Sequence, residues 1–218
     1  MKCVLLLSAP RCGSSCTAAC VNLCGAYLGR SPTQVKDKFN EKGYFENKNI
    51  LKFNNSCLRK IGSSWNTPDE ITHEQRDIML AEYDSLLQII TEEYDQDLCL
   101  IKDPRIAILW PLYRSVLDDL KIDHPMILLK RNQAASVLSM GRMARLSAER
   151  ASSVYDGYYR LIDKMKTDCS THEVHFERLL ADPKVAMKEM CSFLEIPYGK
   201  KQHALVNEFI DEKLLRYK

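Results

Sequence analysis

The residues whose types and spacing could do chemistry begin where the first apolar run of the chain ends. Leu5–Leu7 is followed shortly by Arg11-Cys-Gly-Ser-Ser15, and helix-forming residues come next. If a helix begins near Gly13, the backbone N–H groups of residues 13–16 have no partners within the helix and carry part of its dipole. Arg11 adds a full positive charge, and the two serines add hydroxyl donors. This combination suits a bound phosphate, although an ordinary capped turn would look similar.

The loop differs from a nucleoside-triphosphate loop in one respect. A Walker loop places Lys and then Ser or Thr after its last Gly, whereas Ser14 and Ser15 follow Gly13 here. ATP with magnesium is therefore not the expected ligand, and the loop calls for a different anion.

Charged residues also follow two later apolar runs. Lys102 and Asp103 follow one of them, and Arg131 follows the other, with Ser139 eight residues further along. Each is weak evidence by itself, because Lys102 could be a surface lysine paired with Asp103 and a mid-helix serine is common. Ligands of open α/β sheets bind beyond the carboxyl ends of the strands. Three such segments at three strand ends therefore predict one shared site.

The elements that must position these residues alternate between strands and helices. Short apolar runs predict strands at 2–8, 98–101 and 125–129, and we expect a fourth strand at 171–176. Helical periodicity and capping residues predict helices at 13–28, 49–60, 72–94, 107–120, after Asn132, from Ser147 to 167, at 182–194 and at 202–210. This alternation implies right-handed crossovers and a mainly parallel sheet. We expect an α/β fold with one domain spanning residues 1–218.

Taken in order, these segments resemble the sulfotransferases that use 3′-phosphoadenosine 5′-phosphosulfate (PAPS), especially compact bacterial-type members. The resemblance extends over nearly the whole chain and includes Val174-His-Phe-Glu-Arg-Leu-Leu-Ala-Asp-Pro183 and Phe193-Leu-Glu-Ile-Pro197. It implies a P-loop-like, three-layer fold in which helices flank a mainly parallel central sheet. It also implies in-line transfer of a sulfuryl group from PAPS to a hydroxyl or amine, leaving 3′,5′-ADP, with no need for a metal.

The resemblance implies roles for particular residues. The 5′-phosphosulfate end of the donor would be held by the opening loop, that is by Arg11, Cys12, Gly13, Ser14 and Ser15. Arg131 and Ser139 match the pair that holds the 3′-phosphate, which distinguishes PAPS from ATP. Lys102 and Arg11 would stabilise charge on the leaving phosphate oxygen, where losing one donor commonly costs roughly 3 kcal/mol. Arg216 could close over the site, or it could belong to a solvated tail.

The acceptor must lose a proton, so a general base is expected. Many small-molecule members of the family carry a His just after the strand-end Lys, and this chain has Asp103 there. Glu46, in Gly43-Tyr-Phe-Glu-Asn47, resembles a candidate acidic base of bacterial-type members. We take Glu46 as the first candidate and Asp103 as the reserve, although Glu46 could instead cap the following helix. The five histidines are expected to be structural.

Composition narrows the partners and the compartment. The chain has 218 residues, of which 45% are apolar, and a formal net charge of +2, which argues against a general nucleic-acid or membrane surface. Nine scattered cysteines without zinc-ligand spacing fit free thiols in a reducing compartment. The apolar run at 3–7 is too short for a signal peptide or a membrane span. We expect a cytoplasmic protein with neither a membrane span nor a nucleic-acid partner.

Three rival functions remain open. One is an ATP-dependent kinase of the P-loop type, which the missing Walker lysine disfavours. A second is another nucleotide-phosphate transferase on the same architecture. A third is a module that binds PAPS or 3′,5′-ADP without turnover, which the absent strand-end His keeps open. The acceptor could be a small molecule, a glycan or a lipid, and residues 30–70 together with the helix from Ser147 would shape its site.

Overall fold

A sheet of four parallel strands in the order β2-β1-β3-β4 forms the centre of the molecule. The computed structural model describes residues 1–33, 35–38 and 40–210. The strands are β1 (Lys2–Leu7), β2 (Leu98–Lys102), β3 (Met126–Lys130) and β4 (Thr171–His175). They correspond to the four strands expected from the sequence, which confirms the predicted α/β fold and its parallel sheet.

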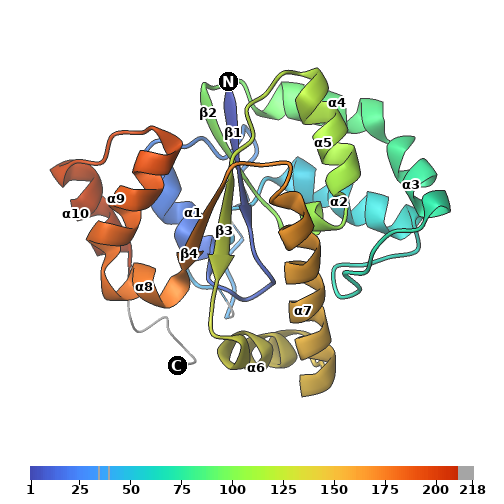
Figure 1. Ribbon diagram of the computed structural model, residues 1–218. Helices are drawn as coiled ribbons and strands as arrows, with labels where there is room; N and C mark the ends of the chain where they lie inside the picture. Colours follow the sequence, from blue (N-terminus) through green and yellow to red (C-terminus); the bar gives the residue numbers. More distant parts are fainter. Residues whose placement is uncertain (34, 39, 211–218) are drawn as a thin grey trace.

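Helices cover both faces of the sheet, which gives the three layers expected (Figure 1). One face carries α1 (Ser14–Leu23), α8 (Phe176–Ala181), α9 (Pro183–Leu194) and α10 (Lys200–Phe209). The other face carries α2 (Lys48–Lys60), α3 (His73–Leu80), α4 (Tyr83–Glu93), α5 (Trp110–Asp119) and α7 (Ala148–Met165). Helix α6 (Gln133–Ala144) lies beyond the carboxyl end of β3. None of the described helices combines the length and apolarity that crossing a bilayer requires.

Strands β1, β2 and β3 bury side chains on both faces, as strands of covered parallel sheets do. In the edge strand β4 only Val174 is buried. Along β1, the odd-numbered residues from Cys3 to Leu7 enter the core shared with α2, α4, α5 and α7. Val4 and Leu6 enter the core shared with α1 and α9. Because side chains alternate along a strand, each face of the sheet supplies one core. These two cores fix the positions of the strand ends where the candidate site residues lie.

Helix α1 is shorter than the predicted helix at 13–28. It ends at Leu23, the chain turns at Gly25 with φ +113°, and Tyr27 runs alongside β2. The Tyr27 N–H donates to the Leu98 carbonyl at 2.9 Å, and the Leu100 N–H donates to the Tyr27 carbonyl at 2.8 Å. An edge strand has backbone groups that need partners. Pairing with β2 therefore decides the conformation of Tyr27 despite its helical sequence pattern.

The single helix predicted at 72–94 is two helices. Thr72 forms the predicted capping box at the start of α3, but the helix breaks at Ala81 and Glu82 before α4 begins. The Glu82 carboxylate accepts a hydrogen bond from Lys60 of α2 at 2.6 Å. Both halves keep their apolar stripe in one core, where Met79 and Leu86 are fully buried. The break thus leaves the predicted buried face intact.

Two short elements were not anticipated from the sequence. A 3₁₀ turn at Pro104–Ala107 connects β2 to α5, which begins at Trp110 and not at 107. Helix α8 begins directly after β4, at Phe176. Such elements are too short for a helical period to stand out in the sequence.

The turn between β1 and α1 contains two residues with left-handed backbone conformation, Arg11 with φ +69° and Gly13 with φ +89°. Gly13 is the residue that precedes α1. A Cβ atom added to Gly13 would lie 2.4 Å from the ring of Phe176, closer than atoms can approach without displacement. Gly13 is therefore required both by its backbone conformation and by the close approach of Phe176.

Replacing Gly13 by Ala should destabilise the fold more than replacing Gly25 by Ala. Both positions have positive φ, so each substitution carries a backbone cost of about 1–2 kcal/mol. Only Gly13 adds a clash, because nothing lies within 4 Å of a Cβ on Gly25. Overpacking of this kind adds about 1–3 kcal/mol. Urea unfolding of the two variants would measure the difference, and equal losses of stability would contradict the packing argument.

Candidate functional site

A cavity of about 480 Å³ opens beyond the carboxyl ends of β1, β2 and β3. Its volume lies within the range of about 300–1,000 Å³ typical of small-molecule sites. The basic side chains along its wall are Arg11, Lys42, Lys102, Arg105 and Arg131, and the carboxylates are Glu41 and Glu46. The larger number of cations suits an anionic ligand.

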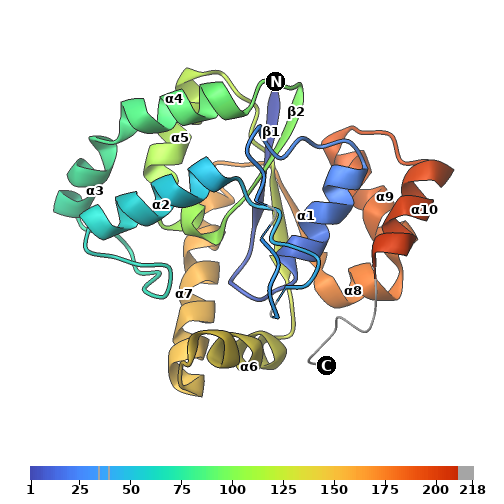
Figure 2. The same cartoon turned by 180° about the vertical axis from the view of Figure 1, so that it is seen from behind.

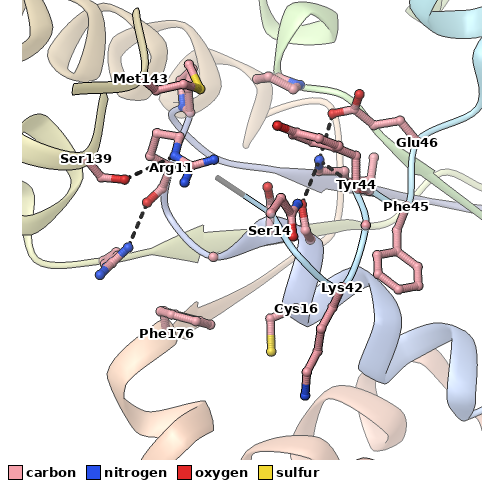
Figure 3. Close-up of a pocket in the computed structure, with 18 of the residues that line it drawn as sticks. Arg11, Ser14, Cys16, Lys42, Tyr44, Phe45, Glu46, Ser139, Met143 and Phe176 are labelled. Atoms are coloured by element: carbon pink, nitrogen blue, oxygen red, sulfur yellow. Dashed lines mark hydrogen bonds and ion pairs between the residues drawn. The ribbon is translucent and has the colours of Figure 1, made fainter. Parts of the chain in front are cut away.

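Helix α1 begins at this cavity, where Gly13, Ser14, Ser15 and Cys16 form part of the wall (Figure 3). The Thr17 N–H donates to the Gly13 carbonyl at 3.1 Å, so the amides of residues 13–16 precede the intrahelical ladder. The first turn contains no acidic residue. The positive end of the helix dipole and these amides therefore meet the cavity together.

Three of the predicted donor-site residues converge on one side of the α1 start. Arg11 Nε donates to Ser139 Oγ at 3.1 Å, and an Arg131 nitrogen donates to the Arg11 carbonyl at 3.0 Å. The Arg131 guanidinium lies 5.5 Å from the ring centroid of Phe176. Burial lowers the pKa of Arg131 from its ordinary value. The β1–α1 turn, the end of β3 and helix α6 thus bring these residues together, although they lie far apart in the sequence.

Lys102 and Glu46 meet on the other side of the α1 start. Lys102 Nζ donates to Glu46 Oε1 at 2.7 Å, to the Tyr44 carbonyl at 3.1 Å and to Ser15 Oγ at 3.4 Å. Lys102 therefore pairs with Glu46 and not with Asp103. Glu46 also does not cap α2, because the side chain of Asn47 accepts the hydrogen bonds from the first amides of that helix. Both candidate catalytic side chains line the cavity.

Asp103 lies behind the cavity wall and not in it. It is fully buried, and its Oδ1 accepts hydrogen bonds from the backbone N–H and the Nε of Arg105, at 2.9 and 2.7 Å. Burial by itself lowers the pKa of Arg105, but Asp103 and, more weakly, Glu46 raise it above its ordinary value. The reserve role of Asp103 as a base is thus corrected, because its carboxylate positions Arg105 and is not exposed to a ligand.

The side chain of Cys12 also points away from the cavity. Its thiol is buried within 3.4 Å of the Ser136 hydroxyl and 3.5 Å of the Tyr159 hydroxyl, and burial raises its pKa. Cys12 is fully buried and is not among the residues that line the cavity. Arg216, the last predicted donor contact, lies outside the described residues. None of the five histidines, all of which are described, lines the cavity.

Within the loop at 40–46, Glu46 was anticipated from the sequence, but Asn40 and Lys42, which also line the cavity, were not. Asn40 Nδ2 donates to Ser15 Oγ at 2.9 Å, and Lys42 Nζ donates to the Phe209 carbonyl. Phe45 packs edge-on against the Phe209 ring, with centroids 5.8 Å apart. These contacts join α1, the loop and the end of α10. No periodic pattern marks such loop residues in a single sequence.

Two tyrosines of α7 were also missed. The Tyr155 hydroxyl donates to the Arg131 carbonyl at 2.9 Å, and the Tyr159 hydroxyl donates to the Leu129 carbonyl at 2.7 Å. They hold the end of β3, and with it Arg131, against α7. Their spacing of four residues places them on one helix face, which is the signal that could have identified them.

Cys16 is the cavity thiol. It is half-buried, while the other eight cysteines are buried, and all nine are free. A hydrogen bond from Cys20 and the nearby charge of Lys42 lower its pKa, although burial opposes them. Thiolates react with alkylating agents and thiols do not. Cys16 is therefore expected to be the most reactive cysteine of the folded chain.

Iodoacetamide should alkylate Cys16 ahead of the other cysteines of the native protein. Because its pKa is lowered, the half-maximal rate should come at a lower pH than for an unperturbed thiol. Intact mass and peptide mapping over a pH series would measure this, and Cys16→Ser should abolish the fast phase. A first adduct on any buried cysteine, or a half-maximal rate at the ordinary thiol pH, would contradict the assignment.

Comparison with known proteins bears on the fold. No protein-family model and no curated protein sequence matches the chain. The sulfotransferase domain from the Synechococcus PCC 7002 olefin synthase is similar in structure, with a TM-score of 0.59 and 18% identity, over 100% of this chain and 83% of that one. The sulfotransferase domain from the curacin biosynthetic pathway has a TM-score of 0.54 and 14% identity, over 92% of this chain and 76% of that one. The chain therefore has the P-loop-like fold of these sulfotransferase domains, as its sequence resemblance implied.

Proposed function

We propose that the chain is a sulfotransferase that moves a sulfuryl group from PAPS to a hydroxyl or amine of an acceptor. One observation carries this proposal: a single cavity has two basic subsites, one on each side of the α1 start. Figure 3 shows Arg11 and Ser139 on one side of Ser14, and Tyr44 and Glu46, beside Lys102, on the other. A ligand with two separate anionic groups fits that arrangement. PAPS is such a ligand.

The donor set agrees with this ligand in its chemistry. The amides of residues 13–16, with Arg11 and Lys102, would receive the phosphosulfate, because helix N-termini favour anions. Arg131 and Ser139 would receive the 3′-phosphate, since arginine can bind phosphate through paired N–H groups. The left-handed backbone of Gly13 forms the turn that brings the amides of residues 13–16 to the cavity. The role of Arg216 stays a prediction.

Sulfuryl transfer requires that the negative charge on the leaving oxygen be stabilised and that the acceptor lose a proton. When bound, PAPS supplies a sulfuryl group attached to a phosphate leaving group. Lys102 and the amides at the α1 start would stabilise the negative charge that grows on the leaving oxygen, as in phosphoryl transfer. An anionic oxygen at Lys102 Nζ would compete with Glu46, which now accepts from it at 2.7 Å. Glu46 could then accept the proton that the acceptor hydroxyl or amine loses.

The rival functions receive less support from the same residues. A P-loop kinase needs a lysine of the opening loop itself, and Ser14 stands after Gly13. Lys102 reaches the site from β2 and pairs there with Glu46. Another nucleotide-phosphate transferase would not need the subsite of Arg131 and Ser139. A binding module without turnover has the same donor contacts, so a turnover measurement separates it from the sulfotransferase.

Calorimetric titration should show that the chain binds 3′,5′-ADP more tightly than 5′-ADP or ATP. We expect a preference of about tenfold or more, because the 3′-phosphate adds charge-assisted hydrogen bonds. Arg131→Ala should remove the preference, and Ser139→Ala should weaken it. Lys130→Ala is the matched control, because Lys130 pairs with Glu173 and lies outside the cavity wall. Equal binding, absent binding or a preference for ATP with magnesium would overturn the proposal.

Glu46→Gln should reduce turnover and leave donor binding intact. Removing a general base commonly lowers kcat about 10²–10⁴-fold, whereas affinity for 3′,5′-ADP should change little. Glu41→Gln is the control, because it removes the other carboxylate of the cavity wall. Release of 3′,5′-ADP from PAPS, measured with a panel of hydroxyl and amine acceptors, gives the rates. Equal turnover in the two variants would exclude Glu46 as the base.

A further inference from the structure

A second hollow lies beside the cavity, between α2 and the turn that follows it. It is lined by Lys52, Asn55, Leu58, Arg59, Ser63, Ser64 and Trp65, and we call it the α2 groove. Figure 2 shows α2 and the chain that leaves it and turns back beneath the helix before α3. Trp65 lines both the α2 groove and the cavity. The two hollows therefore share one wall.

The α2 groove is positively charged. Lys52, Asn55 and Arg59 are spaced three and four residues apart, so one face of α2 presents all three. Neither Lys52 nor Arg59 forms an ion pair with a described residue, whereas Lys60, outside the groove, pairs with Glu82 at 2.6 Å. No carboxylate is among the described residues that line the groove. Two exposed cations without an acidic partner favour an anionic ligand there.

Specific contacts connect the groove to the reacting end of the cavity. Leu51, which lines the cavity, directly precedes Lys52. Arg105 donates to Asn55 Oδ1 at 3.1 Å and also lies 3.9 Å from Glu46, the candidate base. Because the side-chain oxygen of Asn55 accepts the hydrogen bond from Arg105, the side-chain nitrogen Nδ2 of Asn55 is left to donate to a ligand. An acceptor placed at Glu46 can thus continue past Trp65 toward Lys52 and Arg59.

The side of the cavity next to the groove is apolar. Leu51, Trp65 and Pro104 belong to this part of the wall. The rise of α2 puts Arg59 about 12 Å beyond Leu51 along the helix axis. An occupant that reaches Arg59 from the cavity must therefore be long, and its middle must cross an apolar stretch of the wall.

We infer that the acceptor is an amphipathic small molecule with a hydroxyl or amine at one end, an apolar middle and an anionic group at the other end. Its nucleophile lies at Glu46, its middle crosses Leu51 and Trp65, and its anionic group lies between Lys52 and Arg59. This inference rests on the proposed function for the identity of the reacting end. The α2 groove then selects acceptors by charge at a distance from the transferred group.

The test compares two probes of which only one has a charged end, 10-hydroxydecanoate and its methyl ester. Both have the same hydroxyl and the same apolar chain. Calorimetry with the full chain saturated with 3′,5′-ADP should give about five- to tenfold tighter binding of the carboxylate, because exposed charge pairs contribute modestly. The preference should decrease as salt is raised.

Two double variants of α2 isolate the groove. Lys52→Gln with Arg59→Gln should abolish the preference for the carboxylate. Lys48→Gln with Lys60→Gln removes the same charge from the same helix outside the groove, and it should keep the preference. The substituted side chains of the groove variant are exposed, and circular dichroism would verify that both variants fold.

Equal affinity for acid and ester in the unsubstituted chain would overturn the inference. A preference that survives in the groove variant, or that disappears in the control variant, would overturn it as well. Failure of the proposed function gives a different result, because the chain would then not bind 3′,5′-ADP. If the chain does not bind 3′,5′-ADP, the affinities of the acid and the ester are measured without nucleotide. A higher affinity for the acid would then still show that the groove binds the anionic group.

Discussion

The close approach of Phe176 to Gly13 is the contact on which the arrangement of the site depends. Phe176 begins α8 directly after β4, and its ring occupies the space that a side chain on residue 13 would need. The same ring lies beneath the guanidinium of Arg131. One aromatic side chain therefore sets the distance between the start of α1 and the end of β3. The open amides of α1 and the cation of β3 face one cavity because of it.

Charges of alternating sign surround the opposite side of the cavity. Lys102 pairs with Glu46, Glu46 lies near Arg105, and Arg105 pairs with Asp103. A buried charge without a partner would be costly, so each member of this series stabilises its neighbour. The series also joins β2 to the loop at 40–46 and to the start of α2. The group proposed as the base and the group proposed to stabilise the leaving oxygen are thus held together by the same contacts that fix the loop.

The two sides of the cavity differ in character, and this difference underlies the proposed separation of donor and acceptor. The side at α1 and β3 offers amides, hydroxyls and cations to an anion. The side at α2 offers Leu51 and Trp65, and Trp65 also lines the positively charged α2 groove. An acceptor recognised by an apolar middle and a distant anion would contact the chain without competing for the donor contacts. Glu46, the group proposed as the base, lies between Lys102 and Arg105.

The sequence by itself determined the strands and the residues at their ends. Short apolar runs need burial on both faces, so they predict a parallel sheet, and Arg11, Lys102 and Arg131 follow from their places after those runs. Local hydrogen bonding also determined the caps at Asn132 and Ser147, which the structure has. These features depend on neighbours in the sequence, and a pattern of residue types is enough to predict them.

Only the tertiary structure decided which of these residues contact one another. Lys102 could have paired with its neighbour Asp103, but packing buries Asp103 against Arg105 and brings Glu46 to Lys102 from a loop 56 residues away. Tyr27 lies in a sequence pattern typical of a helix, but it is extended because its backbone pairs with the edge strand β2. The α2 groove likewise exists because the chain turns back at Trp65. Contacts between distant segments depend on how whole elements pack, and a local sequence pattern contains no information about that packing.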